Sequence, residues 1–234
     1  MRIGIVGPGR LGRSLAVLLD RAQHQTTLFS RGEAPVGDVI LLTVPDDAIA
    51  TAAAALPATA SVVLHCSGSR DIDVLRPHQP AGSLHPLMTF PGLHALPDLS
   101  GVPAALAGDP QAVEVARQLA VDLGMSPFEI TGDRRLYHAS AVIAGNFATV
   151  LLQAATTALR QAGAPHDRAA EILLPLALQS LRNAPPEPSQ ALTGPVVRGD
   201  ADVIAGHRKA LEEAGLTEIL TLYSALTDHT RTLL

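Results

Sequence analysis

Six residues near the N-terminus have the types and spacing that suit the binding of a phosphate chain. Three glycines are spaced as G-x-G-x-x-G in Gly7-Pro8-Gly9-Arg10-Leu11-Gly12, after an apolar run and before a helical pattern. Gly7 permits a tight turn, Gly9 lets the backbone approach a pyrophosphate, and Gly12 lets helix and strand pack closely. The helix N-terminus supplies free N–H groups for the phosphates. The segment predicts a nicotinamide dinucleotide site; the alternative is a glycine-rich turn without a ligand.

The end of the second predicted strand bears on which dinucleotide binds. NAD sites usually place Asp or Glu there, about 20 residues past the glycine motif, to bind the ribose 2′-hydroxyl. This chain has Leu28-Phe29-Ser30-Arg31, without an acid. Ser30 can donate to a 2′-phosphate and Arg31 can pair with it, while Arg10 can flank the same group. The sequence therefore favours NADP; the alternative is that Arg31 is an exposed loop charge.

Two further segments follow predicted strands, where ligands bind in sheets of this kind. Val44-Pro45-Asp46-Asp47 follows the third strand, and the backbone of Val44 and Pro45 can line the adenosine side or the ribose. The two acids are also typical of a helix start, and both interpretations can hold. Ser67 and Gly68 follow the fourth strand, so we expect them near the nicotinamide. Cys66 is expected to be a small buried residue rather than a nucleophile.

Two histidines and an asparagine are the candidates for catalysis. Hydride transfer is the chemistry of the cofactor, so the protein must position the substrate and handle one proton. His85 follows the fifth strand, His138 lies in the first turn of a long predicted helix, and Asn146 lies about 80° round that helix from it. We expect His85 or His138 to supply or accept the proton and Asn146 to orient the substrate. A stripe of small residues on that helix is also typical of simple packing.

A glycine-bounded loop between two predicted helices offers groups for the substrate. It runs Thr193-Gly194-Pro195-Val196-Val197-Arg198-Gly199-Asp200. Arg198 can bind a carboxylate through two hydrogen bonds, and Thr193 can donate to a substrate oxygen or imine. The alternative is a turn in which Asp200 caps a helix and Arg198 is solvated.

The predicted secondary structure that positions these residues changes near residue 131, from alternating strands and helices to helices alone. Short apolar runs alternate with helical patterns in the first part, which predicts a parallel sheet with right-handed crossovers. From Asp133 onward the pattern is only helical, and the first helix is expected from about Arg134 to Gln161. We therefore predict an α/β dinucleotide-binding domain of the Rossmann type at residues 1–131 and an all-α domain at 132–234.

Composition narrows the function classes. The 234 residues are 47% apolar, which is ample for a buried core, and the net charge of −5 argues against a general nucleic-acid binder. Cys66 is the only cysteine, so neither a disulfide within the chain nor a cysteine-based zinc site is expected, and we assign no metal. The most apolar long stretch, Ala48 to Leu64, reads as a soluble helix followed by a strand rather than as a membrane span, and a cytoplasmic location is expected.

The combined motifs resemble a family of bacterial proteins that pair a Rossmann-like domain with a helical domain of unassigned function. The motifs that carry this resemblance are Gly7–Gly12, Val44-Pro45-Asp46-Asp47, Ser83-Leu84-His85-Pro86-Leu87, Tyr137-His138-Ala139, Leu192-Thr193-Gly194-Pro195 and Arg198-Gly199-Asp200. More distantly, the chain is similar to pyrroline-5-carboxylate reductase, prephenate dehydrogenase and the deazaflavin-dependent NADP reductases, which share helices related to the C-terminal domain of 6-phosphogluconate dehydrogenase. The resemblance implies NADP-dependent redox chemistry and a homodimer formed through the helical domain.

One departure from this superfamily concerns the proton. Its 3-hydroxyacid dehydrogenases and ketopantoate reductases use a lysine from the first interdomain helix, whereas the only lysine here is Lys209, on a helix face with a solvated pattern. The proton therefore falls to His85 or His138. We expect hydride transfer between NADPH and a small C=O or C=N compound, one with a carboxylate if Arg198 binds it. The alternative is a non-catalytic NADP-binding protein that regulates or binds a partner.

Overall fold

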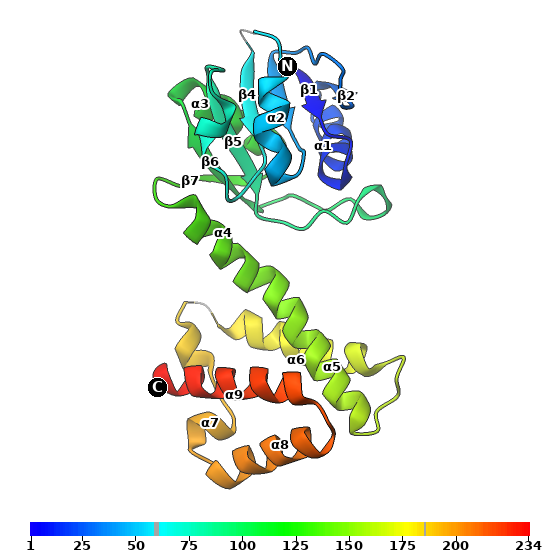
Figure 1. Ribbon diagram of the computed structural model, residues 1–234, viewed down its shortest axis with the longest axis vertical. Helices are drawn as coiled ribbons and strands as arrows, with labels where there is room; N and C mark the ends of the chain where they lie inside the picture. The colour runs from blue at the N-terminus through cyan, green and yellow to red at the C-terminus, as the bar shows by residue number, and fades with distance from the viewer. Residues whose placement is uncertain (59–60, 185) are drawn as a thin grey trace. The chain divides into compact units, whose positions relative to one another are not determined.

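The computed structural model describes residues 1–58, 61–184 and 186–234 (Figure 1). Contacts divide the chain into two compact units, Met1–Val142 and Ile143–Leu234. The division thus falls at the end of α4 (Arg134–Val142), whereas the sequence predicts a boundary between residues 131 and 132.

The first unit is built on a seven-stranded sheet in the order β2-β1-β3-β4-β5-β6-β7. Its strands are β1 (Arg2–Val6), β2 (Gln25–Phe29), β3 (Val39–Leu42), β4 (Val62–His65), β5 (Ala81–Pro86), β6 (Pro103–Gly108) and β7 (Ser126–Glu129). Its helices, besides α4, are α1 (Arg10–Arg21), α2 (Ile49–Ala54) and α3 (Pro110–Asp122), with short 3₁₀ turns η1 (Asp46–Ala48), η2 (Ile72–Leu75) and η3 (Leu93–Ala95). The α/β fold of the Rossmann type is confirmed.

The expected all-parallel sheet is wrong at one pair of strands. Strands β1 to β5 run parallel, but β6 pairs with β5 in the antiparallel sense, and β7 follows β6 in parallel. A parallel neighbour needs a crossover connection, usually a helix. The connection from β5 to β6 has only the single turn η3, so β6 returns beside β5 in the opposite direction.

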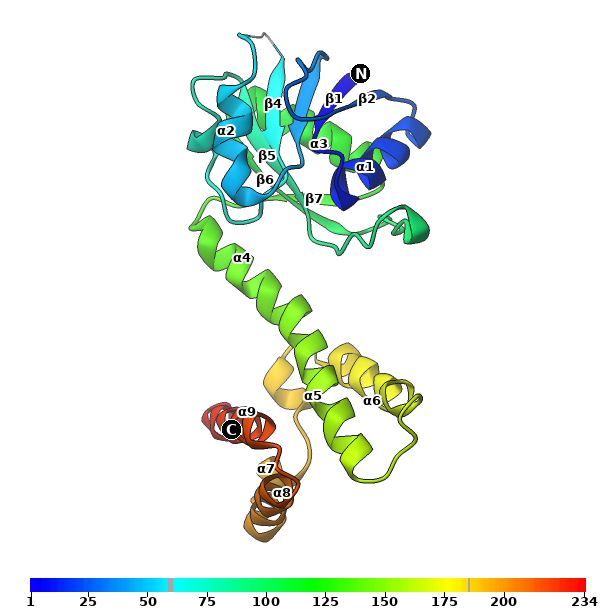
Figure 2. The same ribbon diagram turned by 45° about the vertical axis from the view of Figure 1, so that its right-hand side comes forward.

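Two apolar clusters cover the two faces of the sheet. Alternate residues of β3 face opposite sides: Leu41 packs with α1 and α3, whereas Ile40 packs with α2 and η2. Figure 2 shows α2 and α1 on opposite sides of the strands. All four residues of β3 are buried, as expected for a central parallel strand covered on both faces. Because β3 is held in the core, the residues that follow it at its carboxyl end have fixed positions at the edge of the sheet.

The second unit is helical, and it buries few of its side chains. It contains the π-helical turn η4 (Ile143–Phe147), α5 (Ala148–Gln161), α6 (Ala169–Asn183), η5 (Pro188–Ala191), α7 (Pro195–Arg198), α8 (Ala201–Glu213) and α9 (Thr217–Thr232). Helix α6 packs on α5, and α8 packs on α9. The buried side chains described here are Thr156, Ala169, Ile204 and Thr227.

One helix is long and apolar enough to cross a membrane by length and composition alone. It runs from Arg134 to Gln161 with a mean hydropathy of 1.5, and its apolar window is 6% buried. A single helix of this kind is weak evidence for a span, since core helices pass the same test. Most of the apolar side chains of this helix are at least partly exposed.

Candidate functional site

The glycine loop joins β1 to α1, and Gly9 is the helix N-cap. Gly7 has φ +109°, a backbone conformation that L side chains rarely adopt. A Cβ on Gly12 would overlap the Gly7 carbonyl oxygen and lie 2.5 Å from Thr43 Oγ1. A Cβ on Gly9 would meet no atom within 4 Å. The fold therefore requires glycine at positions 7 and 12, whereas Gly9 leaves open space beside the free N–H groups of α1.

A cavity of about 390 Å³ lies beside this loop, within the first unit. Its lining includes six of the residues predicted to bind the cofactor: Gly7, Pro8, Ser30, Arg31, Val44 and Pro45. Much of the remaining wall is apolar and comes from residues 48–56. Arg10 and Leu11 stand in the first turn of α1. The cavity thus offers an apolar wall and a polar end, a combination that suits a nucleoside.

This cavity also contains an acidic residue that lies outside the segment Leu28–Arg31. Glu33 lines the cavity, and its Oε2 accepts a short hydrogen bond from the Ser30 backbone N–H. A carboxylate there favours a ribose 2′-hydroxyl and opposes a 2′-phosphate. Glu33 thus works against Ser30 and Arg31 in the choice between NAD and NADP.

A second group of side chains meets where β3, β4 and β5 end. Asp46 Oδ2 accepts hydrogen bonds from Ser67 Oγ at 2.8 Å and Ser69 Oγ at 2.7 Å. Burial raises the pKa of Asp46, but the hydroxyls of Ser69 and Ser67, with His138 and Arg70 nearby, leave it below its ordinary value. The carboxylate therefore stays charged and ties the turn after β4 to the turn after β3.

The structure brings His85 and His138 together over Gly68. A Cβ on Gly68 would lie 2.7 Å from His138 Cδ2 and 3.0 Å from His85 Nε2, so only glycine fits beneath the two rings. The rings meet edge to face, with centroids 6.2 Å apart. His85 Nδ1 is also 2.7 Å from the hydroxyl oxygen of Tyr137, one turn into α4. The predicted proton handlers thus form one cluster at the carboxyl ends of the parallel strands.

Burial changes the titration of this cluster. Burial, together with the nearby charges of His138 and Arg134, lowers the pKa of His85 to about 4. His85 is therefore uncharged at neutral pH, which suits it as an acceptor or a relay rather than as an imidazolium acid. Burial raises the pKa of the Cys66 thiol to about 12, which supports its structural role. Among the residues described, no group of three or more His, Cys, Asp or Glu is arranged to hold a metal ion.

The other predicted residues belong to the second unit. Asn146 is exposed in the π-helical turn, a feature frequent at functional sites. Thr193 is exposed before α7. Arg198 pairs with Asp200, with Nε 2.8 Å from Oδ2, so a substrate carboxylate would have to compete with that ion pair. Asp200 stands at the N-terminus of α8 without capping it through its side chain. Roles for these residues stay predictions.

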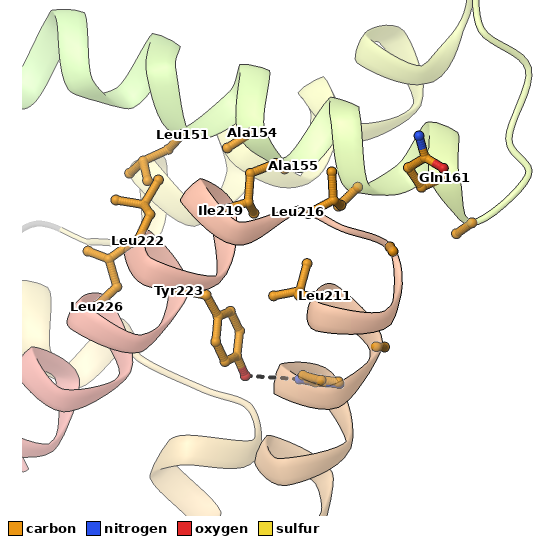
Figure 3. A pocket seen from close by; sticks show the side chains of 15 residues that line it. Leu151, Ala154, Ala155, Gln161, Leu211, Leu216, Ile219, Leu222, Tyr223 and Leu226 are labelled. Carbon is orange, nitrogen blue, oxygen red and sulfur yellow. Dashed lines mark hydrogen bonds between the residues drawn. The ribbon is translucent and has the colours of Figure 1, made fainter.

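The second unit also holds a cavity of about 510 Å³ between α5, α8 and α9 (Figure 3). Its walls are leucine, isoleucine and alanine apart from Gln161 and one hydrogen-bonded pair, His207 Nδ1 and the Tyr223 hydroxyl, 2.9 Å apart. A space with so few polar groups and no charged lining suits the packing of apolar protein surface rather than redox catalysis.

Sequence reasoning assigned no catalytic or binding role to four residues that join His85, Gly68 and His138 in the strand-end cluster: Arg134, Tyr137, Asp46 and Ser69. The Tyr137-His138 pair was visible as a motif, but the partner of Tyr137 is 52 residues away in the chain. The Asp46 contact with Ser69 spans 23 residues. Only the order of the strands brings these groups together.

Comparisons with known proteins agree with this fold. A family model described as a domain of unknown function (DUF2520) matches residues 102–230. A candidate NADP oxidoreductase from Bacteroides fragilis is 21% identical over 99% of this chain and 98% of its own, with a TM-score of 0.80. A protein from Thermotoga maritima is 25% identical over 99% and 97% of the two chains, with a TM-score of 0.76. The 1-pyrroline-5-carboxylate reductase of Streptococcus pyogenes is 18% identical over 99% and 98%, with a TM-score of 0.65. A search of curated proteins finds no match.

Proposed function

The chain belongs to the DUF2520 family, and from that membership and its NADP reductase-like fold we propose an NADP-dependent oxidoreductase. Its proposed reaction is hydride transfer between NADPH and a small C=O or C=N compound. One observation carries the proposal: the glycine loop after β1 and the imidazole pair over Gly68 lie at the same edge of the sheet, at the carboxyl ends of the parallel strands β1, β3, β4 and β5. That edge is where doubly wound sheets bind a dinucleotide and its substrate.

The residues of the first unit fit a nicotinamide dinucleotide. Gly9 leaves room for a pyrophosphate at the N-terminus of α1, and the cavity of about 390 Å³ has an apolar wall for the adenosine. Ser30 and Arg31 would meet the 2′-phosphate, and Ser67 and Gly68 would lie near the nicotinamide. The cofactor supplies the hydride chemistry, while His85 and His138 handle the proton.

A substrate carboxylate is the role proposed for Arg198, with Thr193 as a donor and Asn146 orienting the reacting group. Binding would require the guanidinium to leave Asp200 or to share it. A carboxylate that accepts two hydrogen bonds from one guanidinium is a strong enough ligand for this exchange.

The alternative is an NADP-binding protein without catalysis. It is favoured by the single lysine of the chain, Lys209, which is exposed and pairs with Glu213 on α8. Lys209 therefore does not stand where the lysine-dependent relatives place their acid, on the first interdomain helix.

Thermal-shift titration with NADPH, followed by a turnover panel of imines and 2-oxo acids, separates the two functions. An oxidoreductase is stabilised by NADPH and consumes it with at least one class of compound. Stabilisation without turnover across the panel supports the regulatory alternative. No stabilisation at all contradicts both.

We expect Arg31→Ala to lower the ratio of NADPH affinity to NADH affinity by about tenfold or more, since a hydrogen bond to a charged group contributes roughly 1.5–3 kcal/mol. Glu33→Gln should raise the same ratio, because it removes the carboxylate that opposes the 2′-phosphate. Calorimetric titration of both cofactors against each variant measures the ratios. Equal ratios in the wild type and Arg31→Ala would remove Arg31 from the site.

A homodimer through the helical unit is the second part of the proposal. Helix α6 exposes large apolar side chains: Ile172, Leu174, Leu176, Leu178 and Leu181. An exposed group of apolar side chains of this kind is typical of a surface that another protein covers. The cavity in Figure 3 is likewise lined mainly by apolar side chains. A second copy of the chain would supply matching apolar surface for both, and for the helix Arg134–Gln161.

Leu176→Glu should convert the dimer to a monomer or to aggregates, because Leu176 is 67% exposed and a charge there would be buried on association. Light scattering after gel filtration gives the mass. Val121→Glu is the matched control, as Val121 is 55% exposed on α3 of the first unit. A monomeric wild type, or the same mass for Leu176→Glu and the wild type, would contradict the proposed interface.

The cytoplasmic location expected from the sequence remains part of this proposal.

A further inference from the structure

We propose that Tyr137 is the proton donor of the strand-end cluster. His85 holds the Tyr137 hydroxyl in place by a hydrogen bond and replaces the proton that the hydroxyl gives up. This inference rests on the proposed function and assigns a residue beyond it. The pair is close and fixed: Tyr137 Oη lies 2.7 Å from His85 Nδ1, and the rings meet at 90° with centroids 5.6 Å apart. Phe128 packs against Tyr137 edge to face at 6.2 Å. The hydroxyl is therefore held at the sheet edge while the ring stays partly exposed.

The charges around His85 make it a poor donor in its own right. The titratable groups near it are Arg134, Tyr137 and His138 from α4, His65 at the end of β4, and Asp46 after β3. Burial, with His138 and Arg134, lowers the pKa of His85 to about 4. An uncharged imidazole releases a proton reluctantly at neutral pH. The Tyr137 hydroxyl, whose pKa is raised by burial, keeps its proton until a reaction takes it.

Arg134 supplies the cation that a tyrosine needs after it gives up its proton. This guanidinium is 3% exposed and donates from Nη2 to the Ser67 carbonyl oxygen at 2.7 Å. Its Nε and Nη1 have no hydrogen-bond partner among the residues described. It also stands in the first turn of α4, where the helix dipole disfavours a cation. A buried cation without a paired carboxylate is costly, and it lowers the pKa of Tyr137 against the effect of burial.

The proton transfer balances within this cluster. A bound, reduced nicotinamide dinucleotide would supply hydride to the substrate carbon, and the π pair of the C=O or C=N bond would move to oxygen or nitrogen. That atom takes the proton of Tyr137 Oη. The tyrosine oxygen takes the proton of His85 Nδ1, while Nε2 of the same ring takes one from water. The reverse sequence serves oxidation.

The chain offers a matched control, because it has two tyrosines, no tryptophan, and a second tyrosine–histidine pair in Tyr223 and His207. In Tyr223→Phe, Tyr137 is the only tyrosine, so tyrosinate absorbance reports it alone. We expect saturating NADP⁺ to lower the pKa of Tyr137 by about one unit, because the positive nicotinamide would lie beside it. In Tyr137→Phe, the remaining Tyr223 should titrate unchanged. Circular dichroism at each pH confirms that the fold is retained.

Turnover provides the second measurement. With any compound the wild type reduces, Tyr137→Phe should lower kcat about 100-fold or more while the Kd for NADPH stays within about twofold, and Tyr223→Phe should change neither. NADP⁺ binding without a shift of the Tyr137 titration, or full kcat in Tyr137→Phe, overturns the inference and leaves the proposed function standing. If NADP⁺ does not bind at all, the proposed function fails, and the inference fails with it.

Discussion

Gly12→Ala is expected to lower the free energy of unfolding by about 3 kcal/mol, the upper range for a core overpacked by one methyl group. Its new Cβ would overlap the Gly7 carbonyl oxygen and lie 2.5 Å from Thr43 Oγ1. Neither neighbour can yield easily, since that hydroxyl is 2.8 Å from the same carbonyl oxygen and holds β3 to the loop. The melting temperature should fall by roughly 6–12 °C for a chain of this size.

Gly9→Ala is the control for this prediction. Its Cβ would meet no atom within 4 Å, and Gly9 has φ −75°, which any residue adopts. The stability of Gly9→Ala should therefore match the wild type. Equal melting temperatures for Gly12→Ala and Gly9→Ala would show that the helix does not pack on the loop as described.

His85→Gln is expected to lower kcat by about 100-fold or more, because a positioned acid or base typically contributes 10²–10⁴-fold. Glutamine keeps a hydrogen-bonding group near Tyr137 but cannot relay a proton. His207→Gln removes the equivalent partner of Tyr223 and should leave turnover unchanged. If His85→Gln and His138→Gln both retain full turnover, the imidazole pair is not the proton site.

The pH dependence of this effect follows from the buried ring. His85 has a pKa of about 4 in the folded protein, so it is uncharged throughout pH 5–8. Its contribution to turnover should therefore be level across that range and decline as the pH falls through about 4, where Nδ1 and Nε2 are both protonated. A rate that declines near pH 6.5 instead would indicate a solvated histidine.

The glycine loop and the order of elements in the first unit were predictable because their signals are local. The motif at Gly7–Gly12 and the apolar runs of β1, β3 and β4 follow short spacings that a single segment contains. The predicted strands Arg2–Val6, Val39–Val44 and Ser61–Cys66 match the observed β1, β3 and β4 to within two residues at each end. The carboxyl ends of the strands then placed Ser67, Gly68 and His85 at one edge.

Features that depend on the path of the whole chain were not predictable in the same way. The antiparallel β6 follows from a connection without a crossover helix, which the apolar pattern of the strand itself does not encode. The contact of Tyr137 with His85 joins a helix start to a strand end 52 residues earlier. Glu33 lies two residues beyond the segment Leu28-Phe29-Ser30-Arg31, and only the fold of the loop turns its carboxylate to Ser30.

Cofactor binding by the glycine loop is tested most directly by calorimetric titration of NADPH into the wild type and Gly9→Ala. The wild type should bind, and Gly9→Ala should bind about tenfold more weakly or worse, a loss of ~1.4 kcal/mol, at an unchanged melting temperature. The loss would come from the methyl group between the backbone and the pyrophosphate. A wild type that does not bind NADPH, or equal affinities for the two proteins, would contradict a dinucleotide site at this loop.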